Sequence, residues 1–95
     1  MSAELLIHDK VQDRYGGIVE VKIWSVPKSK DRLHGYKFSL LYIKHDKRIL
    51  GYDNAEGKGD HRHYGSKKMP YKFKSVKMLI EDFYKDLKEV RSHEG

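Results

Sequence analysis

The last fifth of the chain carries an apolar stripe with helical spacing, and this stripe limits the folds open to the rest of the sequence. Its residues recur at steps of three and four over about four turns. They are Val76, Leu79, Ile80, Phe83, Leu87 and Val90. Ser75 precedes the stripe and suits the N-cap position. The pattern predicts an amphipathic helix over about residues 75–91, whose apolar side needs a partner surface.

The segments before this helix alternate apolar and polar residues, as strands with one buried face do. The alternation is clearest over residues 18–26 and weaker over residues 3–11, 36–43 and 48–52. Residues 61–64 can form a further strand at a sheet edge, and His45-Asp46-Lys47 fits a hairpin turn. The spacing of Tyr36, Phe38 and Tyr42 is that of a core face rather than of a base-stacking surface.

These patterns together predict an α+β fold. We expect an antiparallel sheet of four or five strands over about residues 3–74, with the C-terminal amphipathic helix packed on one face. A chain of 95 residues has room for one modest core, so residues 1–95 are expected to form a single domain.

The charge of the chain favours a polyanionic partner. Twenty Lys and Arg residues against 14 Asp and Glu give a net charge of +6, which suits nucleic acid first and an acidic protein second. Residues 28–48 hold seven cations and two acids, and residues 58–74 hold six cations and one acid. The sequence has no cysteine, no signal-peptide pattern and no apolar run near the roughly 20 residues of a membrane helix. We therefore expect a cytoplasmic protein without a membrane partner.

Residues 51–65 combine carboxylates, cations, imidazoles and phenols between glycines, which indicates a site. His61 and His63 are two residues apart, so on a strand they share a face with their Cα atoms about 6.5 to 7 Å apart. Two imidazoles at this spacing can act on opposite sides of one phosphodiester. One removes the proton of the 2′-hydroxyl group, and the other protonates the leaving 5′-oxygen. This is the arrangement of a metal-independent ribonuclease, which uses no cofactor.

Other residues of the basic region have supporting parts in this hypothesis. The predicted catalytic group is His61, His63, Tyr52, Asp53, Asp60 and Lys58, in which a carboxylate orients an imidazole and a cation steadies the phosphate oxygens. The predicted nucleic-acid-binding group is Arg62, Lys44, Lys67, Lys68 and Tyr64, and Lys44 and Lys67 are further candidates for the phosphate cation. On a regular strand Arg62 points away from both histidines. His34 is assigned to a loop without a functional role.

Three other functions remain open, one of which is a protein-interaction module that uses its basic face on an acidic partner. His61 and His63 can form a three-ligand metal set with Asp53, Asp60 or Glu56, which would make a metal-dependent nuclease, although the cations Lys58 and Arg62 oppose a divalent ion. The basic residues alone can make a non-catalytic RNA-binding or ribosome-binding module, whose affinity would depend steeply on salt. A surface hairpin without function accounts for the spacing of the histidines equally well.

Several stretches resemble the TumE-type family of small prokaryotic proteins. They are residues 3–8, 19–27 and 34–38, and above all Gly51-Tyr52-Asp53-Asn54 and Gly57-Lys58-Gly59-Asp60-His61-Arg62-His63. Members of that family are regarded as toxins of toxin-antitoxin modules, paired with a helix-turn-helix antitoxin and suspected of acting on RNA. The resemblance therefore implies a toxin with RNA and such an antitoxin as partners. It supports a site without assigning the roles of its residues, which are Tyr52, Asp53, Asn54, Lys58, Asp60, His61, Arg62 and His63. Independently of the resemblance, exposed strand edges allow a homodimer.

Overall fold

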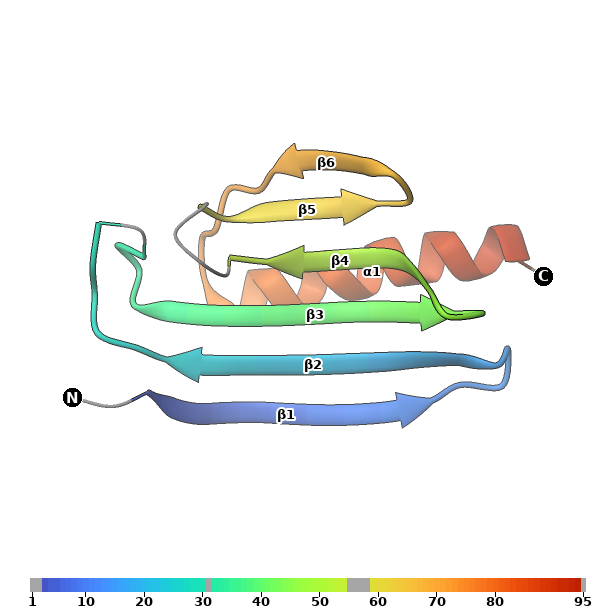
Figure 1. Cartoon of the computed structure of the whole chain (residues 1–95), viewed down its shortest axis with the longest axis horizontal. Coiled ribbons are helices and arrows are strands. Elements are labelled where there is room, and N and C mark those ends of the chain that lie inside the picture. Colours follow the sequence, from blue (N-terminus) through green and yellow to red (C-terminus); the bar gives the residue numbers. More distant parts are fainter. Residues whose placement is uncertain (1–2, 31, 55–58, 95) are drawn as a thin grey trace.

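A computed structural model describes residues 3–30, 32–54 and 59–94 of the chain. It consists of one antiparallel sheet with the strands in sequence order, followed by one helix (Figure 1). The strands are β1 (Glu4–Gln12), β2 (Gly17–Ser25), β3 (Tyr36–Lys44), β4 (Lys47–Asp53), β5 (His61–Tyr64) and β6 (Lys67–Pro70), and the helix is α1 (Val76–Glu94). The predicted α+β fold, with the helix on one face of the sheet, is confirmed.

The described sheet has six strands, against the expected four or five. The additional strand is β6, whose sequence Lys-Lys-Met-Pro has no clear alternation and which pairs only with β5. The hairpin between these strands turns at Gly65, where a φ of 62° suits glycine. The predicted turn after β3 is confirmed: His45 and Asp46 have φ angles of 54° and 60°, as a two-residue type I′ hairpin turn requires.

Helix α1 covers one face of the sheet and makes the core. The buried apolar residues are Val19, Val21, Ile23, Phe38, Leu40, Tyr42, Leu50 and Tyr52 of the sheet and Leu79, Phe83, Leu87 and Val90 of the helix. Tyr36 packs against this cluster, so the prediction that the aromatic residues of β3 form a core face is confirmed. The backbone N–H of Met78 donates to Ser75 Oγ at 3.1 Å, which confirms Ser75 as the N-cap. No helix in the described ranges is long and apolar enough to cross a membrane.

The alternate residues of the same strands lie on the opposite side, which we call the open face. In the described part of the chain no helix covers it, and Figure 1 shows α1 behind the sheet. The strand pairing places these positions on the open face: Glu20, Lys22 and Trp24 of β2; Lys37, Ser39 and Leu41 of β3; Gly51 and Asp53 of β4; His61 and His63 of β5; and Lys68 of β6. The open face is therefore the side on which polar strand residues meet solvent.

The carboxylate of Asp13 joins three parts of the fold. It accepts hydrogen bonds from the backbone N–H groups of Tyr15 and Gly17 in the turn after β1, from the Tyr42 hydroxyl of β3 and from the Arg91 guanidinium of α1. Burial raises the pKa of Asp13, but these hydrogen bonds outweigh burial and the pKa is lowered overall. Asp13 is therefore held as an anion at neutral pH.

Asn54 fixes the end of β4 against β3. Its side chain is 1% exposed. Asn54 Oδ1 accepts the backbone N–H of Phe38 at 2.9 Å, and Nδ2 donates to the Tyr36 carbonyl at 2.8 Å. The side chain of Asn54 thus makes the hydrogen bonds to β3 that a strand backbone would make where β4 ends. It also holds the neighbouring Asp53 in place.

Replacing Leu87 by alanine tests the core. Leu87 is 0% exposed, so the variant should lose about 2–5 kcal/mol of unfolding free energy through the lost burial and the remaining cavity. The neighbouring exposed Lys88→Ala is the matched control and should change stability by about 0.5 kcal/mol or less. Urea unfolding followed by circular dichroism measures both. Equal stability of the two variants would contradict the assigned core.

Candidate functional site

Strands β4 and β5 bring Asp53, His61 and His63 together on the open face. Asp53 pairs directly with His61 and Gly51 with His63, so the three side chains point to the same side of the sheet. Asp53 Oδ1 lies 2.6 Å from His61 Nε2, and Asp53 Oδ2 lies 3.7 Å from His63 Nε2. The two imidazole centroids are 4.9 Å apart, with the rings at 82°. The structure thus brings Asp53 together with both predicted histidines.

Both ring nitrogens of His61 face oxygen acceptors. Nδ1 lies 3.1 Å from the Gly59 carbonyl and Nε2 faces the Asp53 carboxylate. Since a carbonyl and an ionised carboxylate only accept, both hydrogen bonds form when the ring carries both protons. His61 is 7% exposed, so the Gly59 carbonyl and the Asp53 carboxylate fix the orientation of its ring.

His63 has the opposite surroundings. Arg48 Nη2 lies 3.0 Å from His63 Nδ1. A guanidinium only donates, so Nδ1 accepts and the proton of the neutral ring is on Nε2, facing Asp53. Burial and the nearby Arg48 cation lower the pKa of His63 from its ordinary value of 6.5. His63 is therefore neutral at pH 7, beside a histidine whose two nitrogens both face oxygen acceptors.

Arg48 reaches His63 because Gly51 has no side chain. A Cβ at residue 51 would lie 3.0 Å from Arg48 Cδ and 3.2 Å from Leu41 Cδ2. An irregularity in the pairing between Tyr42 and Ile43 also sets Arg48 opposite Ile43, on the open face. Sequence reasoning missed Arg48. The available signal was the glycine three residues after it, inside strand β4.

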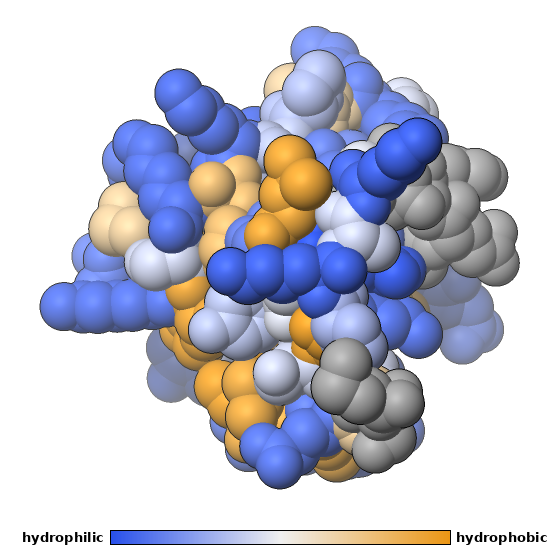
Figure 2. Space-filling model, turned by 90° about the vertical axis from the view of Figure 1, so that its left-hand side faces the viewer, coloured by the Kyte–Doolittle hydropathy of each residue, from blue (hydrophilic) through white to orange (hydrophobic). Residues whose placement is uncertain are grey.

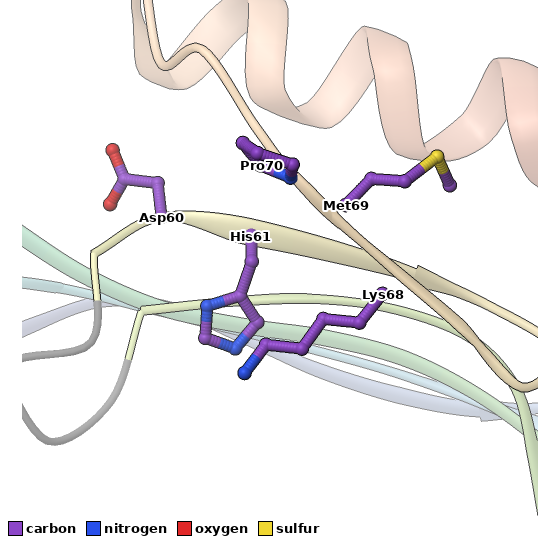
Figure 3. Close-up of a pocket in the computed structure, with 5 residues that line it drawn as sticks. All are labelled: Asp60, His61, Lys68, Met69 and Pro70. Carbon is purple, nitrogen blue, oxygen red and sulfur yellow. The ribbon is translucent and has the colours of Figure 1, made fainter.

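Lys68 brings a second cation to the histidines. It pairs with His63 across β5 and β6, and with His61 it lines a hollow of about 280 Å³. Figure 3 shows the Lys68 side chain extending toward the ring of His61, while Asp60 points away from that ring. Lys67 pairs with Tyr64 and so belongs to the other face. Of these two predicted RNA-binding lysines, the structure brings Lys68 to the site.

Tyr52, Arg62 and Tyr64 lie on the helix side of the sheet, because they alternate with the open-face residues. The Tyr52 hydroxyl and Arg62 Nε both donate to Asp86 of α1, and the Tyr64 hydroxyl donates to Glu89. Burial and Asp86 raise the pKa of Tyr52. The structure therefore does not bring Tyr52, a predicted catalytic residue, to the histidines. Arg62 also points away from the histidines, as the sequence predicted.

The side chains of two further predicted residues, Asp60 and Lys44, also lie apart from the rings of His61 and His63. Asp60 pairs with His34, whose Nε2 is 3.0 Å from Asp60 Oδ2. His34 also packs on Phe73 with centroids 4.1 Å apart, so this loop histidine has a structural contact that its sequence context did not reveal. Lys44 ends β3 opposite Gly17, at the far end of the strand from Ser39, the partner of Asp53. Lys58, like Glu56 of the metal hypothesis, lies outside the described residues.

The histidine cluster, which consists of Asp53, His61 and His63, fits a metal ion only in part. Asp53, His61 and His63 offer ligand atoms within 4.8 Å of one another. His61 suits this role, because a metal-bound histidine usually donates its other N–H to a carbonyl, as His61 does to Gly59. His63 does not suit it: Arg48 occupies Nδ1, so the neutral ring keeps its proton on Nε2, where a metal would need a lone pair. Arg48 also brings a positive charge that opposes the ion.

The fold and the site together define a small basic α+β protein with acid-base groups gathered on an open sheet face. The sequence model of one family, described as Toxin TumE, matches residues 3–91. The chain therefore belongs to the TumE toxin family, and the resemblance seen in the sequence is confirmed. A toxin of this kind has an antitoxin as its partner. Comparisons with curated proteins and with solved structures found no match.

Replacing Arg48 by glutamine should raise the pKa of His63, because the variant removes the cation that helps to lower it. NMR titration of the histidine ring protons measures this change. Lys67→Gln is the matched control: it also removes one positive charge, but from the other face, and should leave the His63 titration nearly unchanged.

Gly51→Ala provides a second route to the same result without loss of charge. The added methyl group would lie 3.0 Å from Arg48 Cδ and shift this side chain by a few tenths of an ångström, so the pKa of His63 should rise slightly, and by less than in Arg48→Gln. An unchanged titration in both variants would contradict the contact between Arg48 and His63.

Proposed function

We propose that this toxin is a metal-independent endoribonuclease that uses His61 and His63 on the open face. The observation that carries the proposal is the pair of adjacent imidazoles with opposite surroundings: Nδ1 of His63 faces the donor Arg48, whereas both nitrogens of His61 face oxygen acceptors. A neutral and a cationic imidazole are the base and the acid that RNA cleavage needs.

The proposed reaction needs no water in its first step. His63 accepts the proton of the 2′-hydroxyl group through Nδ1, the 2′-oxygen bonds to phosphorus, and the bond from phosphorus to the 5′-oxygen breaks. The Gly59 carbonyl holds Nδ1 of His61, and His61 gives the proton of Nε2, which faces Asp53 in the absence of RNA, to the leaving 5′-oxygen. The products are a 2′,3′-cyclic phosphate and a 5′-hydroxyl end. Asp53 orients His61 and stabilises its charge.

Arg48 and Lys68 supply positive charge to the phosphate in this proposal. Arg48 holds His63 Nδ1 in the absence of substrate. A phosphate oxygen is a stronger, charged acceptor for the guanidinium, so an RNA phosphate draws Arg48 away and frees Nδ1 for the 2′-hydroxyl proton. Lys68 lies on the other side of the histidines and offsets charge on the remaining phosphate oxygen. These two cations take the part that the sequence assigned to Lys58, Lys67 or Lys44.

A non-catalytic RNA-binding module is the second candidate function. It is favoured by one specific observation: both nitrogens of His61 and Nδ1 of His63 already have protein partners. In that case the cluster serves to shape the open face, and Arg48 and Lys68 carry the affinity for RNA or for a ribosome.

The partners that belong to the proposal are RNA and a helix-turn-helix antitoxin. An RNA target places the action of the toxin in the cytoplasm. A homodimer is also proposed, through the outer edge of β1, which pairs with β2 on one side only among the described strands.

Cleavage of end-labelled RNA in excess EDTA tests the proposed function. The parent protein should cleave and leave 2′,3′-cyclic phosphate ends, and it should not cleave the same oligomer with a 2′-deoxy group at the cleaved linkage. His61→Ala and His63→Ala should each lose about 10²- to 10⁴-fold in rate. His8→Ala is the matched control, because His8 is an open-face histidine of β1 that pairs with Glu20, and it should keep full activity.

The other functions give different results in this assay. Activity that appears only when Mn²⁺ or Zn²⁺ replaces EDTA would assign the cluster to a metal site. Binding of RNA without cleavage under both conditions, unaffected by the histidine variants, would assign the protein to the binding module. Circular dichroism of each variant shows whether the fold survives.

A further inference from the structure

Trp24 is the one Trp, Tyr or Phe residue that the described strands place on the open face. It follows the fully buried Ile23 on β2 and pairs with Lys37 of β3, whose neighbour Phe38 is in the core. The other aromatic residues of the strands occupy helix-side positions; they are Tyr36, Phe38, Tyr42, Tyr52 and Tyr64. Trp24 is partly exposed, so a large flat ring meets solvent on the same side of the sheet as His61 and His63.

The strand register places Trp24 near the histidine cluster. Trp24 lies beside Lys37, Lys37 is two residues from Ser39 on β3, and Ser39 lies beside Asp53. Strands are about 4.8 Å apart and rise about 3.3 Å per residue, so the Cα atoms of Trp24 and Asp53 are about 12 Å apart. Figure 2 looks onto this end of the sheet, where hydrophilic and hydrophobic residues both lie on the described surface. A short nucleic-acid segment can therefore reach both Trp24 and Asp53.

Cations lie on both sides of the line that joins Trp24 to Asp53 across the open face. The cationic open-face positions of the described strands are Lys10, Lys22, Lys37, Arg48 and Lys68, against the carboxylates Glu20 and Asp53. Lys37 Nζ lies 5.1 Å from the centroid of the Trp24 ring. An arriving base can displace this ammonium group from the ring toward an adjacent phosphate. Aromatic rings with cations beside them are how sheet surfaces bind single strands without reading their sequence.

We propose that the open face binds single-stranded RNA across the strands, with one base stacked on Trp24 and Lys37 on the adjoining phosphate. The backbone then passes Arg48 and Lys68 at the histidines. This inference rests on the proposed function and names its substrate class. The strand is single because a stacked base must present its face, which pairing and stacking in a duplex conceal. Trp24 is thus a substrate-binding residue, separate from the groups that transfer protons.

The chain contains one tryptophan, so its fluorescence reports on this position alone. The probe is a 2′-O-methyl RNA oligomer, which cannot be cleaved because it has no free 2′-hydroxyl group. We expect the single-stranded oligomer to quench Trp24 fluorescence, and the same oligomer annealed to its complement to bind more weakly with little quenching. Binding without cleavage separates recognition from catalysis.

Variants of Trp24 measure the contribution of stacking, with affinity followed by anisotropy of a labelled oligomer. Trp24→Ala should bind about 5- to 150-fold more weakly, which is the loss of one stacked base, and Trp24→Phe should lose less because it keeps a ring. Lys37→Gln should reduce the slope of log affinity against log salt by about 0.7. Tyr84→Ala is the matched control, since Tyr84 is 45% exposed on α1, and it should bind like the parent.

The failures of the two proposals are distinguishable. Equal single-strand affinity in the parent and the folded Trp24→Ala variant would overturn the stacking proposal and leave the ribonuclease proposal intact, and so would equal binding of the duplex. If the parent protein neither binds the oligomer nor cleaves ordinary RNA, the stacking proposal and the ribonuclease proposal are both overturned. Quenching of Trp24 by polyglutamate but not by RNA would assign the open face to an acidic protein partner.

Discussion

The covering of one sheet face by α1 is the constraint on which the rest of the structure depends. Side chains alternate along a strand, so burying Val21, Leu40 and Tyr52 under the helix leaves Lys22, Ser39 and Asp53, the residues next to them in the chain, on the other side. Hydrophobic burial thereby selects which polar residues become neighbours across the strands. The histidine cluster is a consequence of the core, because its members lie at the positions that the core does not use.

Two buried polar side chains refine this arrangement. Asp13 connects the first turn to β3 and to the C-terminal part of α1, and Asn54 connects the end of β4 to β3. Leaving either group buried without partners would cost free energy, so each one favours a single placement of the chain around it. Asn54 directly follows Asp53, and its two backbone hydrogen bonds therefore help to set the carboxylate against His61.

Periodicity in the sequence was sufficient to predict the helix, the alternating strands, the shared face of His61 and His63 and the opposite direction of Arg62. These features depend on residues close together in the chain. The contact of Arg48 with His63 depends on strand register and on the space at Gly51, which no local pattern contains. The same holds for the pairing of Asp60 with His34, for Tyr52 against α1 and for β6, which is ordered by pairing with β5 rather than by its own alternation.

The cluster is divided between a strand of the core and a short outer hairpin. Asp53 is on β4, whereas both histidines are on β5, and β5 and β6 have four residues each. Polar contacts such as Arg62 with Asp86 and Tyr71 with Asp82 join the hairpin and the segment after it to α1, and Tyr64 and Tyr71 also pack against the core. Small outer units of this kind open at lower free energy than the whole protein. Opening of this hairpin would separate both histidines from Asp53 without unfolding the core, because the buried apolar residues lie on β2, β3, β4 and α1.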